Sequence, residues 1–222
     1  MERIAMRRSS LLVITLLLLC MARGTALAEH RGLYIGASGG GSMVFAGRSA
    51  DDQGSFNMAY RPAVQWGAII GWDIGPDNPL GGEGRVEIEY SHRSNRLEQI
   101  EFIDGKFTAD GDLVADTLLV STCYLHRTET RLFPYFVLGA GAARMAASGL
   151  QVTGQPFGSG SAMVFAWQAG AGTDIALTQN VSLDIGYRLF GTSRPVFTEP
   201  DGRTFTADYL GHSIILGVRY GF

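Results

Sequence analysis

Residues 165–190, FAWQAGAGTDIALTQNVSLDIGYRLF, form two runs of alternating apolar and polar residues joined by a short turn at 177–180. A period of two predicts extended strands with one apolar and one polar face, and the short turn predicts an antiparallel hairpin. Each run can exceed the roughly 9–11 residues that a tilted strand needs to cross a bilayer. The stretch therefore predicts one hairpin of a transmembrane β-barrel, with its apolar face toward lipid and its small and polar residues inside.

The composition of the chain agrees with this interpretation. Of the 222 residues, 46% are hydrophobic, 18% are charged and 30 are glycine. Because alternation dilutes apolar residues along a strand, apolar content at this level without a long apolar run in the body of the chain favours a barrel over a helical membrane protein. Inward glycines leave room for larger side chains in a narrow barrel. Composition alone also allows a glycine-rich soluble β-protein.

The N-terminus predicts export. A basic start precedes an apolar segment at 11–20, and the Ala-Leu-Ala at 26–28 has the small-x-small form of a signal-peptide cleavage site. The apolar segment is too short for a comfortable spanning helix, so we interpret it as the core of a secretory signal peptide. We predict a cleaved signal peptide at 1–28 and one outer-membrane β-barrel domain at 29–222.

The predicted mature chain is acidic and has one cysteine. The formal charge of the whole chain is −3, and residues 1–28 contribute four arginines and one glutamate, so the remainder is more acidic. Nucleic-acid binding needs a basic surface and is disfavoured. Cys20 leaves with the signal peptide, and Leu19 before it disfavours a lipoprotein anchor. Cys123 then has no disulfide partner, and we interpret it as a small residue of the barrel wall or core.

Eight segments of the mature chain have the character of strands. They lie at 32–44, 61–73, 84–94, 114–125, 133–144, 165–176, 181–190 and 207–222. Long connections follow the first, third, fifth and seventh segments, at 45–60, 95–112, 146–160 and 192–206. Short turns follow the second, fourth and sixth segments, at 75–79, 126–132 and 177–180.

This asymmetry of connections is typical of an even-stranded outer-membrane barrel, with long extracellular loops and short periplasmic turns. A soluble eight-stranded barrel of the lipocalin kind has no strong reason to show it. We therefore predict an all-β protein, an eight-stranded antiparallel up-and-down transmembrane β-barrel with both termini in the periplasm. The segment 114–125 alternates least clearly, and its facing stays open.

The predicted interior is charged. In the segment 84–94, charged residues alternate with apolar ones and would be untenable in a dry sandwich core, whereas in a barrel lumen they can pair across strands. The residues expected in such a network are Arg85, Glu87, Glu89, Asp174, Asp184, Arg188 and Arg219. An eight-stranded barrel is only wide enough to be filled by side chains, so we interpret the network as a plug that fixes strand register. The alternative is a gated polar path for ions.

Aromatic residues stand near the ends of several predicted strands. They are Trp66, Trp72, Tyr90, Tyr135, Trp167, Tyr187 and Tyr220. Tryptophan and tyrosine are enriched at both membrane interfaces, where the ring is apolar and the polar atom reaches water. We interpret these residues as interfacial anchors rather than as platforms for carbohydrate stacking.

The mature chain resembles the OmpA-like and opacity-type outer-membrane β-barrel proteins. The resemblance rests on GLYIGASGGG from residue 32, GRVEIEYSHRSN from 84, FPYFVLGAGAA from 133, the hairpin at 165–190 and the ending HSIILGVRYGF. It implies a monomer without a cofactor, in contact with outer-membrane lipid and lipopolysaccharide. It also implies that Val218, Tyr220 and Phe222 form the signal read by the barrel-assembly machinery. The family includes structural anchors, adhesins, surface antigens and small pores.

One short motif suggests catalysis. The sequence His92-Arg93-Ser94-Asn95 is similar to the H-x-S-N pattern of outer-membrane lipid A deacylases, in which a histidine activates a serine nucleophile. Two-residue spacing places His92 and Ser94 on one strand face. The motif lies in the third predicted strand rather than late in the barrel, and the third catalytic member has only loose candidates in Glu98 and Glu101. No cluster with metal-ligand spacing and no phosphate loop is credible.

We therefore expect a structural or surface-interacting protein whose four long loops make extracellular contacts, since loops on a rigid scaffold often carry binding. A narrow ion-conducting pore and, less favoured, a lipid A hydrolase built on His92 and Ser94 are the alternatives.

Overall fold

The computed structural model describes residues 32–45, 47–50, 54–75 and 83–222. The predicted signal peptide and most of the turn predicted at 75–79 lie outside these ranges. The strands are β1 Gly32–Val44, β2 Gly47–Ala50, β3 Ser55–Tyr60, β4 Ala63–Asp73, β5 Gly84–Phe102, β6 Gly105–Leu125, β7 Leu132–Val152, β8 Gln155–Ala176, β9 Val181–Thr192, β10 Val196–Thr198, β11 Thr204–Ala207 and β12 Leu210–Gly221. No helix in the described part of the chain is long and apolar enough to span a membrane.

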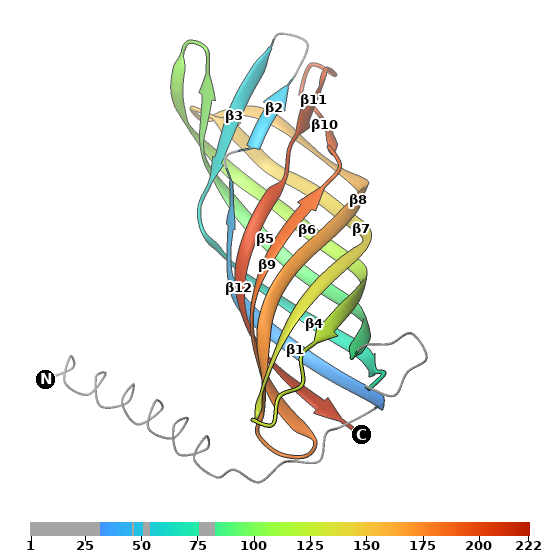
Figure 1. The fold of residues 1–222 in the computed structure, drawn as a ribbon. Coiled ribbons are helices and arrows are strands. Elements are labelled where there is room, and N and C mark those ends of the chain that lie inside the picture. The colour runs from blue at the N-terminus through green and yellow to red at the C-terminus, as the bar shows by residue number, and fades with distance from the viewer. Residues whose placement is uncertain (1–31, 46, 51–53, 76–82) are drawn as a thin grey trace, which may run out of the picture.

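Eight of these strands close into a barrel (Figure 1). The order around the ring is β1, β4, β5, β6, β7, β8, β9, β12 and back to β1, and every neighbouring pair is antiparallel. The ring is closed by the first and last strands, with Tyr34 opposite Gly221. The predicted eight-stranded antiparallel barrel is confirmed.

Strands β8 and β9 form the hairpin predicted at 165–190. Asp174 lies opposite Asp184, and in the turn the Leu177 N–H donates to the Val181 carbonyl at 2.9 Å. Phe165 is 56% exposed on the outer face, whereas Asp174 and Asp184 are buried inside. The alternation therefore has the facing that the sequence predicts.

The facing of β6, which the sequence leaves open, follows from the exposure of its side chains. Leu118 and Val120 point outward, whereas Leu119 and Cys123 are buried inside. Both faces of the strand carry apolar residues, because the outer face meets lipid and the inner face meets the core. Cys123 is a free, buried cysteine, as expected for a small core residue.

The prediction of long loops at 95–112 and 146–160 is wrong. Strands β5 and β6 continue through the first segment and meet at a tight turn, and β7 and β8 do the same in the second. Register shifts conceal these strands in the sequence, one of them between Arg96 and Gln99. Such an irregularity inserts a residue, so the side chains beyond it exchange faces and the period of two is interrupted.

The other two predicted loops also contain strands. The segment 45–60 includes β2 and β3, and the segment 192–206 includes β10 and most of β11. With the outer parts of β5, β6, β7 and β8 these strands make a second closed ring, in which β10 pairs with β8 through Thr198 and Ser159. We call this second ring the extension; it continues the tube beyond the first barrel (Figure 1).

The interior of the extension is apolar. Its core includes Phe56, Met58, Ile100, Phe197 and Phe205, each at most 3% exposed. The ring of Phe205 lies against those of Phe197 and Phe56, with centroids 5.5 and 6.2 Å apart. The predicted charged residues therefore line the first barrel, whereas the extension, whose segments were predicted as loops, has an apolar core.

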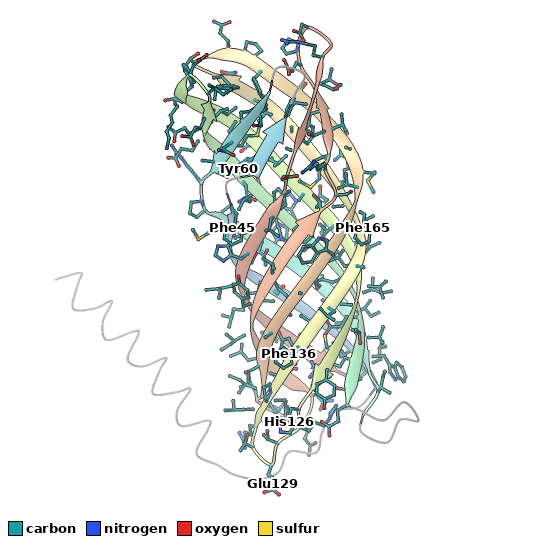
Figure 2. The ribbon with its side chains drawn as sticks, turned by 45° about the horizontal axis from the view of Figure 1, so that its top comes forward. Phe45, Tyr60, His126, Glu129, Phe136 and Phe165 are labelled. Carbon is teal, nitrogen blue, oxygen red and sulfur yellow. The ribbon has the colours of Figure 1, made fainter. Side chains whose placement is uncertain are left out.

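The outer face of the first barrel is an apolar band. Outward side chains run along it from Phe136 near one end to Phe45 and Phe165 where the extension begins (Figure 2). Of the expected interfacial aromatics, those exposed or half-buried on this face are Trp66, Trp72, Tyr90, Trp167, Tyr187 and Tyr220. Tyr135 was assigned incorrectly: it is 2% exposed inside the barrel, because its odd position on β7 faces the lumen.

The apolar core predicts that the extension is stable only while its rings stay packed. Replacing Phe205 by alanine should cost about 3–5 kcal/mol, as for other large-to-small core changes. We expect limited proteolysis of the folded Phe205→Ala variant to cut within the extension and leave the first barrel intact. Ile103→Ala is the matched control, because Ile103 is 91% exposed. Equal protease resistance of both variants would contradict a packed extension.

Candidate functional site

The interior of the barrel at the end opposite the extension is organised around Arg219 of β12. Its guanidinium binds Asp174 of β8, and it lies 3.2 Å from Asp184 of β9 and 3.6 Å from Glu87 of β5. All four side chains are at most 7% exposed. One arginine thus joins side chains from four strands of the barrel, β5, β8, β9 and β12.

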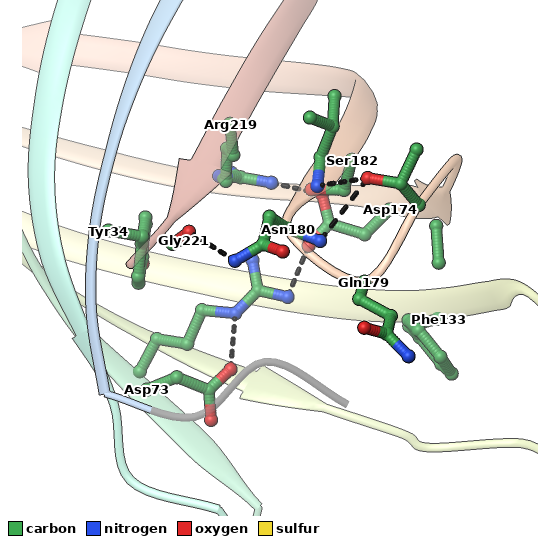
Figure 3. A pocket seen from close by; sticks show the side chains of 13 residues that line it. Tyr34, Asp73, Phe133, Asp174, Gln179, Asn180, Ser182, Arg219 and Gly221 are labelled. Carbon is green, nitrogen blue, oxygen red and sulfur yellow. Dashed lines mark hydrogen bonds and ion pairs between the residues drawn. The ribbon is translucent and has the colours of Figure 1, made fainter. Parts of the chain in front are cut away.

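A second arginine extends the network to Asp73, which Figure 3 shows together with Asp174 and Arg219. Arg85 binds Asp174 and lies 3.1 Å from Asp73, which also accepts a 2.6 Å bond from Arg127. A cavity of about 70 Å³ lies among these side chains and the β8–β9 turn. Asp73 and Arg127 are not among the predicted lumen residues, although the alternation along β4 could have indicated that Asp73 faces inward.

Two buried tyrosines complete the polar packing. Tyr34 donates to Glu87 and Tyr135 donates to Asp184, each at 2.6 Å. A Cβ atom at Gly172 would lie 2.5 Å from the Tyr135 hydroxyl, so glycine is needed there. Arg188 donates to the same hydroxyl at 2.9 Å. The predicted lumen residues are thus all inside, with tyrosine hydroxyls linking them.

Toward the extension, the polar interior includes Arg93, which is not among the predicted lumen residues, and then Asn95, which accepts a 2.8 Å bond from Tyr209. Arg93 is 1% exposed, donates to Gln65 at 2.9 Å and to Ser91 at 2.7 Å, and lies 4.2 Å from the Phe190 ring centroid. Arg93 lies an even number of positions from Glu87 and Glu89 along β5, so the alternation could have indicated that it faces the lumen with them. Glu89 is half-buried and accepts a 2.6 Å bond from Gln168. Beyond this layer lies the apolar core of the extension.

His92 and Ser94 lie on the outer face of β5, toward the extension. The Nδ1 atom of His92 lies 2.7 Å from Asp116 of β6, and its ring stacks on Trp66 at 5.4 Å. Within the described residues, no hydrogen bond joins Ser94 to His92. The acid beside His92 is therefore Asp116, which pairing between β5 and β6 brings opposite it.

The two glutamates expected as third catalytic members are engaged elsewhere. Glu98 pairs with Arg61 at 3.4 Å, and Glu101 pairs with Lys106 at 3.6 Å. Both lie toward the extension, Glu98 within the register shift on β5 and Glu101 beyond it. Sequence distance alone could not select Asp116, because the strand register decides which acid lies beside His92.

The residues expected to form the assembly signal share the outer face. Val218, Tyr220 and Phe222 are 51%, 47% and 65% exposed, and the rings of Tyr220 and Phe222 meet edge to face. Recognition of these residues by the assembly machinery stays a prediction. Among the described residues, no group of three or more His, Cys, Asp or Glu side chains could hold a metal ion.

The outer surface of the extension carries paired charges. Arg96 donates to both oxygens of Asp110, at 2.7 and 3.0 Å. These bonds lower the pKa of Asp110 to about 2, so the carboxylate stays charged above that pH. Arg203 donates its backbone N–H to one oxygen of Asp201 at 3.1 Å and its Nε–H to the other at 2.7 Å, and these bonds lower the pKa of that carboxyl. The charged outer face of the extension contrasts with the apolar band of the barrel.

The buried network predicts that Arg219 is needed for stability. Arg219→Leu leaves three buried carboxylates without their shared cation, which should cost roughly 3–5 kcal/mol. We expect a lower temperature of conversion from the folded to the unfolded band in a gel heat-modifiability assay, and a smaller decrease for Arg188→Leu. Arg61→Leu is the control, because its exposed pair with Glu98 should contribute about 0–1 kcal/mol. An Arg219→Leu variant that unfolds at the wild-type temperature would contradict this role.

Comparison with known proteins agrees with the architecture. A family model described as the outer membrane protein beta-barrel domain matches residues 12–222. Neisserial surface protein A (NspA) is similar in structure, with a TM-score of 0.55 and 17% identity over 86% of this chain and 97% of its own. OprG from Pseudomonas aeruginosa has a TM-score of 0.54 and 15% identity, over 88% and 99%.

At these identities the solved structures show the fold. No curated protein sequence matches the chain. The family model covers nearly the whole sequence, and the closed ring, the apolar outer band and the polar lumen are what such a barrel requires. The chain belongs to the outer membrane protein beta-barrel domain family and is a protein of the bacterial outer membrane.

Proposed function

We propose that this protein is a surface-interacting outer-membrane barrel that holds a rigid extension outside the cell for contacts with extracellular partners. The observation that supports this role is the extension itself, a closed ring with a buried apolar core. Flexible loops would need neither the closed pairing nor the aromatic core. A rigid platform lowers the entropy that is lost when a partner binds.

The tip of the β5–β6 hairpin is the contact region we favour. Ile103 is 91% exposed at the turn, which is unusual for a large apolar side chain without a partner. Lys106 and Glu101 pair beside it at 3.6 Å and give the tip a charged rim. Exposed apolar groups with polar rims often mark protein contacts, although a single side chain defines only the centre of such a patch.

Adhesion assays test this role. A laboratory strain expressing the protein should adhere to cultured host cells or to extracellular-matrix proteins several-fold better than the empty strain, and Ile103→Ser should remove most of the gain. Leu177→Ser is the matched control, because Leu177 is an exposed apolar residue in a turn at the opposite end of the barrel. Wild-type expression without any gain in adhesion would contradict the proposal.

The interior argues against the alternative role of an ion-conducting pore. An ion entering from the extension would meet the packed rings of Phe56, Phe197 and Phe205, and an apolar constriction excludes hydrated ions by dewetting. Past that core, Arg93 and the Arg219 network fill the lumen. The closed packing also supports a barrel that folds as a monomer.

The expected result in planar lipid bilayers is therefore the absence of stable conductance steps after insertion of the purified protein. Insertion is verified separately, by co-flotation of the reconstituted protein with lipid vesicles, because opening the apolar core alone would leave the lumen filled by Arg93 and the Arg219 network. Reproducible wild-type steps would restore the pore alternative.

A second candidate function, lipid ester hydrolysis, is favoured by the pairing of His92 with Asp116 at 2.7 Å on the lipid-facing side. An acid that orients a histidine beside a serine is the arrangement of a serine hydrolase. The missing bond between Ser94 and His92 and the stacking of His92 on Trp66 oppose this role.

Mass spectrometry of lipid A distinguishes the two roles. We expect identical lipid A masses from cells expressing wild-type protein and Ser94→Ala, because the serine is not joined to its base. Loss of one acyl chain with wild type only would make the protein a lipid A hydrolase. An Asp116→Asn variant with intermediate activity would then assign the acid.

A further inference from the structure

We propose that the outer face around Arg144 of β7 binds the phosphate group of an outer-leaflet lipid, whose acyl chains lie on the apolar wall beside it. Arg144 is exposed on the outer face, between Asp116 of β6 and Met163 of β8. This site is separate from the extension tip, so its failure and the failure of the proposed surface role are distinguishable.

Arg144 stands where the apolar band ends. The next outward-facing row along the barrel, on the side away from the extension, consists of Leu118, Ala142 and Phe165. Leu118 and Phe165 are 58% and 56% exposed, which places them against acyl chains in the membrane. On β5 and β6, the outward acidic, basic and histidine side chains begin at the level of His92 and Asp116. Lipid phosphates lie at this boundary between hydrocarbon and water.

Arg144 is not held in a direct pair, although its charge acts on Asp116 across the strand pair. Arg61, Arg96 and Arg194, which lie outward on the extension, each bind a carboxylate at 3.4 Å or less. Arg144 makes no hydrogen bond or ion pair with any other described residue. The nearest acid across the strand pair, Asp116, already accepts bonds from Tyr90 at 2.9 Å and His92 at 2.7 Å.

A guanidinium at this level suits a phosphate. Arginine offers a planar fork of donors that matches phosphate oxygens, and its charge acts at greater range near a low-dielectric surface than in bulk water. The carboxylate of Asp116 would repel a phosphate, so we place the phosphate on the side of Arg144 that faces Met163 of β8. Trp66 and Tyr90 nearby anchor the same level of the membrane.

The apolar wall selects a lipid rather than free phosphate. Ala142 and Ala140 on β7 lie between Leu118 and Val120 of β6 and Phe165 of β8, so the outer wall next to Arg144 is apolar on the side away from the extension. An acyl chain on this wall adds apolar contact to the single charge contact. A lone exposed arginine holds a free anion weakly, because water and salt screen the charge.

Native mass spectrometry of the detergent-solubilised barrel tests the site, with purified bisphosphorylated lipid A as the probe. We expect wild type to retain lipid A and Arg144→Gln to bind it about tenfold more weakly, whereas Arg144→Lys keeps most of the affinity. Arg96→Gln is the matched control on the same outer face; its binding should stay within about twofold, because Arg96 is already bound to Asp110. The heat-modifiability assay verifies that each variant is folded.

The source of the phosphate is tested in the same assay. Dephosphorylated lipid A should bind wild type about as weakly as phosphorylated lipid A binds Arg144→Gln, and millimolar inorganic phosphate should not displace lipid A. Equal retention of both lipids would show a nonspecific annulus and overturn the proposal. Equal weakening by Arg96→Gln and Arg144→Gln, or displacement of lipid A by inorganic phosphate, would overturn it as well.

Discussion

Backbone hydrogen bonding in lipid is the constraint on which the rest of the structure depends. Hydrocarbon offers no partner to an amide, so every strand that crosses it must pair on both sides, and the ring must close. Closure through β1 and β12 brings Arg219 on the last strand beside acids carried by β5, β8 and β9. The ion-paired interior is therefore a product of the closed ring, because no single hairpin holds both the cation and its acids.

The environment outside the wall explains why the interior changes character along the tube. In the first barrel the wall faces lipid, so outward residues are apolar and the polar ones turn inward around Arg219. In the extension the wall faces water, so the charges turn outward, as with Arg96 and Asp110, and the phenylalanines turn inward. The change takes place between Arg93 and Phe190, where a guanidinium packs on an aromatic ring.

The sequence predicts which way residues face where a strand alternates cleanly between apolar and polar residues. It fails where a register shift interrupts the alternation or where both faces of a strand are apolar. Glu87 and Asp174 were placed correctly in the interior because their strands alternate cleanly. Register shifts concealed the extension, and β6 concealed its facing because Leu118 and Leu119 are both apolar. The neighbour of His92 could not be predicted either, because Asp116 reaches it only through the register of two strands.

The continuity of β5, β6, β7 and β8 through both rings has a mechanical consequence. Each strand runs from the first barrel into the extension as one element, and the pairing resumes after each register shift, so no loop separates the two rings in these strands. A pull on the β5–β6 tip along the strands loads many interstrand hydrogen bonds together in shear, since those bonds lie across the direction of force. A cell tethered through this tip would thus be held by the whole embedded wall, and the tether would yield at the partner's contact before the barrel came apart.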